Sequence, residues 1–298
     1  MTDGSAALRA DPAALRAEAE GLSAPLPALL AEAQHLAATV VLGEHGRRRA
    51  GAGADFWQYR AAQPGDDSRA IDWRRSARAD AAFVQDKEWQ TAQTVTVWVD
   101  RGQSMGFASE PKHPTKAHRA RVLALAAAIL LVRGGERVGM GSEGLPPRRG
   151  TTMLARMADA LAKDTAGDYV APVTAGMPPR SRALFVSDFL GDPSPTVQAV
   201  TEAADRGIKG AMLQVLDPQE EAFPVLGRTI FESMSGGLRH ETLKAGELRG
   251  RYLERLAERK ARLSDLARAT GWMFSTHHTS TPPATALLWL HAALERRA

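Results

Sequence analysis

The sequence predicts an α/β protein with a doubly wound, mostly parallel, Rossmann-like sheet and a smaller appended module near its N-terminus. Two runs rich in β-branched and apolar residues, Thr94 to Val99 and Ala183 to Ser187, lack charge and are each followed by an aspartate. Such runs are typical of strands that are buried on both faces. Longer helical patterns alternate with the strands, and this alternation indicates a parallel sheet covered by helices on both sides.

The amino-acid composition restricts the class of protein. The chain has 298 residues, of which 44% are hydrophobic, enough for a large core. Its net charge of +4 permits nucleic-acid binding but does not imply it. With no cysteine, the chain has no disulfide, thiolate metal site or cysteine nucleophile. The longest apolar run, Val122 to Val132, is shorter than the roughly 20 residues of a membrane span, and the N-terminus lacks signal-peptide features. We therefore expect a cytoplasmic protein without a membrane span.

We expect three segments. Residues 1–53 form a helical preface that ends in a basic Gly/Arg loop, 54–89 form the appended module, and 90–298 form the α/β domain. In the preface, Asp11 and Pro12 begin one helix, and Pro25 and Pro27 precede a second that runs toward Val41. The module is rich in aromatic residues, so we expect it to pack on the α/β domain and to unfold with it.

The α/β domain is predicted element by element. Thr115 caps a helix that ends at Arg133, and a short strand follows from Arg137 to Gly141. Thr151 or Thr152 begins the next helix. The remaining expected elements are helices over 195–206, 245–269 and 284–297, and strands over 183–188, 208–217 and 272–276.

Oxygen-bearing side chains follow several of these strands. Because ligands bind beyond the carboxyl ends of parallel strands, these loops are the first place to look for a site. Hard oxygen ligands from separate loops suit Mg²⁺ or Mn²⁺. The alternative is that the aspartates only hydrogen-bond loop amides. The candidate metal ligands are Asp100, Ser104, Thr151, Thr152 and Asp188.

The module contains the turn sequence PGDDSRAIDW. We interpret its charged residues as a structural network of ion pairs and backbone hydrogen bonds, with Trp73 packed beneath. A nuclease-like metal cluster of Asp66 and Asp72 is the alternative, but no histidine nearby could serve as a base. The residues with a structural or interaction role are Arg60, Pro64, Gly65, Asp66, Asp67, Arg69, Asp72, Trp73 and Arg78.

These motifs carry a family resemblance. The segments DFWQYR, QPGDDSRAIDWRRSAR and VTVWVDRGQSM, together with ALFVSDF and LDPQEEAFP, resemble the DUF58 family of bacterial proteins. That resemblance implies a von Willebrand factor A-like core in a short, soluble form of the family. It further implies a non-enzymatic, protein-binding adaptor that acts with a MoxR-type AAA+ ATPase in chaperone-like maturation or stress-related assembly.

The resemblance also bears on the metal site. Such A domains hold a metal at a DxSxS loop, completed by a threonine and an aspartate from two other loops. Here Gly102 replaces the first serine, whereas Ser104, Thr151 or Thr152, and Asp188 match, so a degenerate site for Mg²⁺ or Mn²⁺ is implied. Gly102→Ser would then restore the missing ligand and tighten metal binding.

Two further functional classes stay open at this stage. A metal-dependent phosphoesterase or nuclease would use Asp66 and Asp72, or Asp100 and Asp188. A nucleic-acid-binding protein would use the basic helix from Arg249 to Arg268, although acidic residues at helical neighbour spacings favour a solvated face. The sequence has neither a P-loop nor a Gly-x-Ser-x-Gly elbow.

Overall fold

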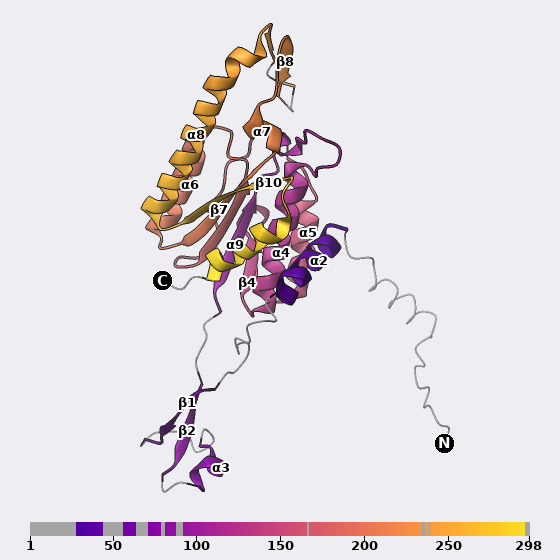
Figure 1. Cartoon of the computed structure of the whole chain (residues 1–298). Coiled ribbons are helices and arrows are strands. Elements are labelled where there is room, and N and C mark those ends of the chain that lie inside the picture. Colours follow the sequence, from indigo (N-terminus) through magenta and orange to yellow (C-terminus); the bar gives the residue numbers. More distant parts are fainter. Residues whose placement is uncertain are drawn as a thin grey trace, which may run out of the picture.

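The computed structural model describes residues 28–43, 56–63, 71–78, 81–87, 92–165, 167–233, 236–237 and 239–295. Its larger part, the α/β body, consists of the described residues within 28–43 and 92–295 (Figure 1). The described residues within 56–87 form a smaller unit, the module. None of the described helices combines the length and the apolar character that crossing a membrane requires.

A six-stranded sheet forms the centre of the body. Its strand order is β10-β7-β6-β3-β4-β5, and every neighbouring pair is parallel except β4 with β5. The predicted doubly wound, mostly parallel sheet is confirmed. From β3 the chain moves outward to β5 on one side and then returns to β6 on the other, so β3 and β6 flank the switch point. The strands are β3 Thr94–Val99, β4 Arg137–Met140, β5 Leu145–Arg148, β6 Arg182–Ser187, β7 Lys209–Leu216 and β10 Met273–His278.

Helices cover both faces of the sheet and create two cores. The larger core contains residues of α2, α4, α5 and α9 together with Val95, Val97 and Val99 of β3. The smaller core contains residues of α6 and α8 and includes Trp98, the neighbour of those valines on the opposite face. The prediction that β3 is buried on both faces is therefore confirmed. The helices are α2 Ala28–Gly43, α4 Lys116–Arg133, α5 Thr151–Leu161, α6 Pro193–Asp205, α8 Ala245–Thr270 and α9 Pro283–Glu295.

Local sequence signals explain most boundaries. The Thr115 side chain accepts a hydrogen bond from the backbone N–H of His118 at 3.1 Å and caps α4 as predicted. Gly271 ends α8 with φ of 70°, a conformation that favours glycine. Within the α/β body, two strand regions were not predicted. These are β5, which contains two prolines, and the hairpin of β8 Thr229–Glu232 and β9 Arg239–Thr242 beside the N-terminal end of α8 (Figure 1).

The N-terminal segment corrects the expected division of the chain. Helix α2 lies at the predicted place, but its Leu30, Ala33 and Ala37 are buried in the larger core against α4, so it belongs structurally to the body. The expected helix at Asp11 and Pro12 and most of the Gly/Arg loop lie outside the described residues.

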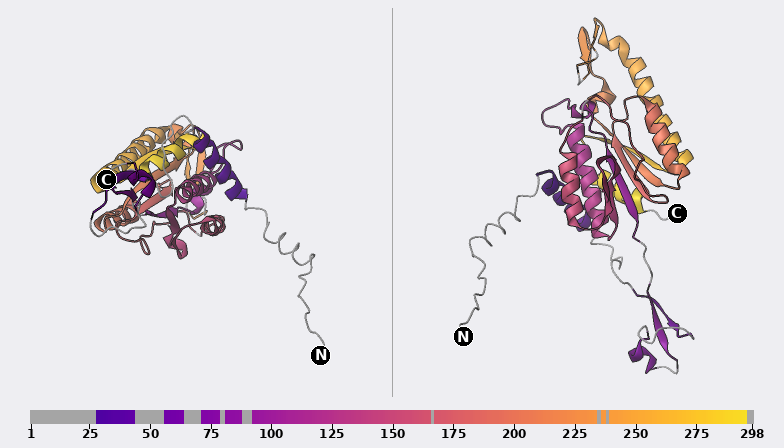
Figure 2. Two further views of the ribbon diagram at one scale, coloured as in Figure 1. Left: turned by 90° about the horizontal axis from the view of Figure 1, so that it is seen from below. Right: turned by 180° about the vertical axis from the view of Figure 1, so that it is seen from behind.

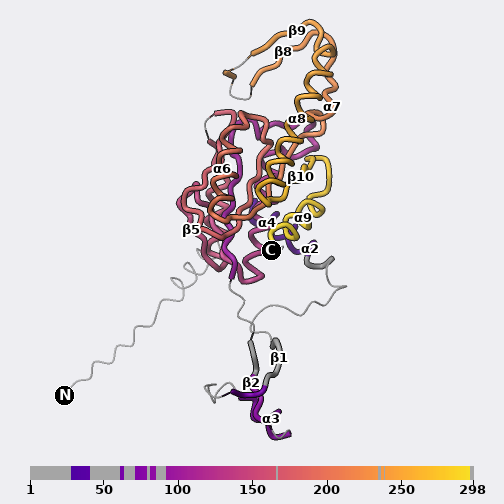
Figure 3. The backbone as a smooth tube through the Cα atoms, turned by 90° about the vertical axis from the view of Figure 1, so that its left-hand side faces the viewer, coloured from indigo at the N-terminus to yellow at the C-terminus, as the bar shows by residue number. Residues whose placement is uncertain are grey.

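The module is a two-stranded antiparallel ribbon of β1 Phe56–Ala61 and β2 Phe83–Lys87, with the short helix α3 Trp73–Ser76 between them. Figures 2 and 3 show that this ribbon stands apart from the α/β body. The expectation that the module packs on the α/β domain is wrong. No described residue of the module belongs to either core of the body, so the described structure gives no reason for the two units to unfold together.

Candidate functional site

Acidic side chains converge at the carboxyl edge of the sheet. Asp100, Asp188 and Asp217 directly follow β3, β6 and β7, and each is almost completely buried. Helix α4 begins at the same edge with Lys116, whose side chain is also buried. Since burying unpaired charge is costly, the positions of these groups relative to one another determine what the edge can do.

Lys116 is the centre of this cluster. Its Nζ lies 2.7 Å from Oδ2 of Asp188 and 2.6 Å from Oε1 of Glu220, and its side chain is only 1% exposed. Burial alone would lower the pKa of Lys116, but the two carboxylates outweigh this effect and raise it above its ordinary value. Burial raises the pKa of Glu220 despite the neighbouring ammonium. The lysine is therefore a buried cation held between two acids.

Several backbone contacts fix the two acids. The Leu190 N–H donates to Oδ1 of Asp188 at 3.0 Å, and the Gln214 side chain donates to the Asp188 carbonyl at 2.8 Å. Glu220 lies in the short helix α7 Pro218–Ala222, where Asp217 is the N-cap and Glu220 completes the capping box. A capping box thus presents the second carboxylate to Lys116.

Asp100 accepts hydrogen bonds from the loop that follows β3 and from Ser187. Its Oδ1 accepts the Gly102 N–H at 2.8 Å, and its Oδ2 accepts the Ser187 hydroxyl at 2.8 Å. Burial raises the pKa of Asp100 to about 6, and these two hydrogen bonds offset only part of that effect. Ser104 also lies here, but its Oγ is buried with no hydrogen-bond partner among the described residues.

The predicted ligand set does not come together. Because β5 runs antiparallel to β4, with Arg148 opposite Val138, the end of β5 lies at the amino edge of the parallel strands. Thr151 and Thr152, which follow β5 and are exposed, are therefore at the opposite edge from Asp100, and their assignment as ligands is wrong. The residues that do approach are Gly167 and Asp168, where the Asp168 carbonyl accepts the Ser104 N–H at 3.0 Å.

Gly102 has a structural explanation. A Cβ atom on this residue would lie 2.4 Å from the Asp168 carbonyl oxygen, so the loop has no room for the serine of the DxSxS pattern. Asp188 is already bonded to Lys116 and Asp100 to Ser187. Within the described part of the chain, no three His, Asp or Glu side chains are grouped as metal ligands. The residues at this edge do not fit a divalent ion.

The structure places the motif residues of the module differently from one another. Pro64, Gly65, Asp66, Asp67 and Arg69 lie outside the described residues, and Arg60 is in β1. Asp72 caps α3 by accepting the Arg75 N–H at 3.0 Å, which fits its predicted structural role. Trp73 is 63% exposed and Arg78 is exposed, so the interpretation that Trp73 packs beneath the turn is wrong.

A small cavity adjoins Asp100 at the carboxyl edge. It has a volume of about 160 Å³, and its lining includes Asp100, Ser187 and Tyr169. Tyr169 is 51% exposed and packs against Gly191, at which a Cβ would lie only 2.7 Å from the tyrosine ring. This edge therefore offers a partner an aromatic side chain beside a buried carboxyl group.

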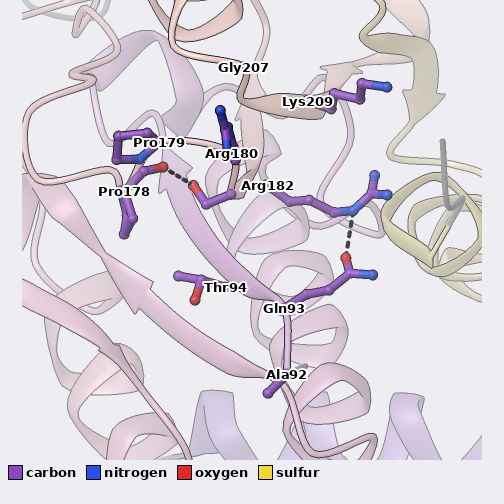
Figure 4. Close-up of a pocket in the computed structure, with 10 residues that line it drawn as sticks. Ala92, Gln93, Thr94, Pro178, Pro179, Arg180, Arg182, Gly207 and Lys209 are labelled. Atoms are coloured by element: carbon purple, nitrogen blue, oxygen red, sulfur yellow. Dashed lines mark hydrogen bonds between the residues drawn. The ribbon is translucent and has the colours of Figure 1, made fainter. Parts of the chain in front are cut away.

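A second hollow, at the amino edge of the sheet, is shown in Figure 4. It has a volume of about 380 Å³ and is lined by Pro178, Pro179 and the cations Arg180, Arg182 and Lys209, among others. The Arg182 guanidinium donates to the Gln93 side chain at 2.6 Å, and Lys209 extends away from the prolines (Figure 4). The cations do not converge on one point, so this hollow is a poorer candidate than the carboxyl edge.

No motif in the sequence marks Lys116 or Glu220 as a site residue. A signal was present for Glu220, because Asp217-Pro-Gln-Glu220 is the pattern of a capping box at the end of a predicted strand. Lys116 follows the predicted cap Thr115 directly, and the first turn of a helix is an unusual place for a cation. That mismatch with the helix dipole is a signal for a specific acidic partner.

Comparison with known proteins assigns the family. The family described as "Protein of unknown function DUF58" matches residues 58–262, more than half of the chain. This chain belongs to the DUF58 family. It is 29% identical over 258 residues to uncharacterized proteins Rv1480 of Mycobacterium tuberculosis and Mb1516 of Mycobacterium bovis, covering 78% of this chain and 77% of theirs.

Two solved structures show a loose similarity. The hypothetical protein BatB from Bacteroides thetaiotaomicron is 13% identical, with a TM-score of 0.39 over 68% of this chain and 98% of that one. An aerotolerance-related membrane protein from Bacteroides fragilis matches with the same TM-score and coverage at 14% identity. At this TM-score the similarity does not support an argument about the site.

Proposed function

We propose that this DUF58 protein is a non-enzymatic, cytoplasmic adaptor that binds other proteins at the carboxyl edge of a von Willebrand factor A-like domain without a divalent ion. The observation that supports the proposal is the position of Lys116, whose ammonium lies between Asp188 and Glu220, where the family pattern would bring a metal to Asp188. The Lys116 ammonium supplies Asp188 with an internal counter-charge, so in this proposal partner binding does not require a metal.

The partner that the family resemblance implies is a MoxR-type AAA+ ATPase. Tyr169 is the side chain of the carboxyl edge best placed to contact it, because the ring is half exposed beside the small cavity at Asp100. Aromatic side chains that stand at a preformed hollow are frequent anchors of protein interfaces. In this proposal the chain contributes a binding surface, and the ATPase supplies the energy-dependent step.

The test uses the purified chain and the MoxR-type ATPase of the same bacterium. Their affinity, measured by biolayer interferometry without nucleotide, should be the same in Mg²⁺ as in EDTA, and Tyr169→Ala should weaken it. The matched control is Leu288→Ala, which truncates an exposed apolar residue on α9. Loss of binding in EDTA, or equal binding by Tyr169→Ala, would contradict the proposal.

A second arm addresses the enzyme alternatives. The chain alone should not turn over nucleic acids, phosphate esters or ATP in the presence of Mg²⁺ or Mn²⁺. Turnover that disappears in Asp100→Ala would establish an enzyme at the carboxyl edge and replace the adaptor proposal.

A further inference from the structure

Trp73 stands out among the aromatic residues of the described chain. Its side chain is 63% exposed, more than that of any other aromatic residue whose burial the structure describes, whereas Trp98 and Trp272 are buried in the smaller core. A tryptophan side chain gains a large amount of free energy from burial, so an exposed one on a small unit suggests a surface that is covered by something else.

The module holds this tryptophan in a fixed position. Asp72 caps α3, the Ser76 hydroxyl donates to the Asp72 carbonyl at 2.7 Å, and the Phe83 N–H donates to Ser76 Oγ at 2.8 Å. The backbone N–H of Asp72 also donates to the Phe83 carbonyl at 2.9 Å. These bonds connect both ends of the helix to β2 without using the Trp73 side chain. Trp73 is thus displayed on a preorganised support, which lowers the entropic cost of binding.

The surroundings of Trp73 are basic. Arg74, Arg75 and Arg78 are all exposed, and the Arg75 guanidinium lies over the Phe83 ring, 5.6 Å from its centroid. The nearest carboxylate in sequence, Asp72, is used by the helix cap. Tryptophan and arginine are the residue types most enriched at the energetic centres of protein interfaces.

We propose that Trp73 is the anchor of a second docking surface, with Arg74 and Arg78 beside it, for a partner protein that presents an apolar pocket bordered by carboxylates. The tryptophan ring would fill the pocket, and the two guanidinium groups would pair with the acids around it. This surface goes beyond the proposed function, because it lies on the module and not at the carboxyl edge of the body.

Charge favours a protein over a phosphate polymer. Segment 44–88 contains nine basic and eight acidic residues, a near balance that is poorly suited to the continuous negative charge of nucleic acid or an anionic membrane. A second copy of the chain is disfavoured as well. In a symmetric pair of α3 helices, the arginines of one copy would face those of the other.

The test is a selection with the full chain as bait. A phage-displayed library of random peptides is selected on the wild-type chain and depleted on Trp73→Ala, and the recovered peptides are synthesised. We expect sequences that combine carboxylates with an aromatic or aliphatic residue. In fluorescence anisotropy, Trp73→Ala should weaken their binding about 30-fold, as for an interface hot spot.

Matched variants separate recognition from folding. Arg74→Glu and Arg78→Glu should each weaken binding, and added salt should weaken the wild-type complex, whereas Leu288→Ala should leave affinity unchanged. Amide exchange at Phe83 should stay slow in Trp73→Ala, which shows that the module is still folded. Tyr169→Ala, the variant that tests the carboxyl edge, should bind these peptides with wild-type affinity. Failure of the Trp73 surface can therefore be distinguished from failure of the proposed function.

Three outcomes would overturn the docking surface. A selection that yields no Trp73-dependent peptide would do so directly. Trp73-dependent binding of an oligothymidylate or of phosphatidylglycerol vesicles, without peptide binding, would instead assign the surface to a phosphate polymer or a membrane. A dimer that is lost in Trp73→Ala, seen by sedimentation equilibrium, would assign it to a second copy of the chain.

Discussion

Replacing Lys116 with methionine tests the arrangement of the carboxyl edge most directly. The substitution keeps most of the apolar stem and removes the ammonium that lies 2.7 Å from Asp188 and 2.6 Å from Glu220. Asp188 is fully buried and would keep, at Oδ1, the Leu190 N–H. Removing one partner of a buried ion pair costs about 3–5 kcal/mol, because the remaining charge is left without compensation.

The expected change is large enough to measure easily. Because the pKa of Lys116 is raised above 10.5, the ammonium is present at pH 7 and its whole contribution is lost in the variant. A loss of about 4 kcal/mol corresponds to a melting temperature lower by roughly 10 °C in a domain of this size. In urea, followed by circular dichroism, it corresponds to a midpoint lower by about 1–2 M.

The control for this experiment is Lys209→Met. Lys209 is exposed, has no ion pair within the described residues and should change stability by less than about 0.5 kcal/mol. Adding Glu220→Gln to Lys116→Met should recover part of the loss, because it removes one of the uncompensated acids. A Lys116→Met protein that unfolds at the wild-type urea midpoint would mean that the two ion pairs do not stabilise the fold, and Asp188 would again be a candidate metal ligand.

Two further predictions concern the loop after β3. The pKa of Asp100 is about 6 in the folded state, against an ordinary value of 3.8. As pH rises, the unfolded state therefore loses this proton before the folded state does. The contribution of Asp100 to the free energy of unfolding falls by about 3 kcal/mol between about pH 4 and pH 6. Asp100→Asn should therefore flatten that part of the stability curve, as measured by urea unfolding at several pH values; an unchanged slope would mean that Asp100 is not the group responsible. Gly102→Ser should lower stability and should not create Mg²⁺ or Mn²⁺ binding in isothermal titration, because its Cβ would lie 2.4 Å from the Asp168 carbonyl oxygen. The control is Gly250→Ala in α8, where a Cβ would meet open space, and this variant should stabilise the folded protein by about 0.5–1 kcal/mol. If Gly102→Ser did bind metal, the degenerate metal site would again be the better interpretation.

The sequence predicted some members of the site for a physical reason that holds in the structure. Asp100 and Asp188 each follow an uncharged strand, and parallel strands that lie side by side bring their carboxyl ends together. The same reasoning fails for Thr151 because β5, with two prolines among its four residues, gives no strand signal and runs antiparallel. Because β5 is antiparallel to β4, Thr151 and Thr152 lie at the amino edge of the parallel strands and not at the carboxyl edge.

The site residues that were not predicted, Lys116 and Glu220, meet only because the fold brings distant parts of the sequence together. Lys116 and Glu220 are separated by 104 positions, and no local pattern reports that their side chains meet. For Trp73, the sequence predicted a buried side chain where the structure has an exposed one. Clustered aromatic residues favour a buried core, but a small two-stranded ribbon has few places to bury them. The hydrogen bonds of Asp72 and Ser76 to their neighbours, visible only in the structure, explain how α3 remains ordered while its tryptophan is exposed.

The two proposed surfaces lie at opposite ends of β3. Residue 92 leads from the module into the amino end of this strand, and Asp100 follows its carboxyl end, while the module stands apart from the body (Figure 1). The two surfaces are therefore on different units of the chain, so in these proposals one chain could hold a partner at Trp73 and another at Tyr169 at the same time. Because neither core of the body includes a described residue of the module, binding at one surface should leave the affinity at the other unchanged. Such independence is what the proposed adaptor would require, and the Lys116 ion pairs at the carboxyl edge would let it bind there whether or not divalent ions are present.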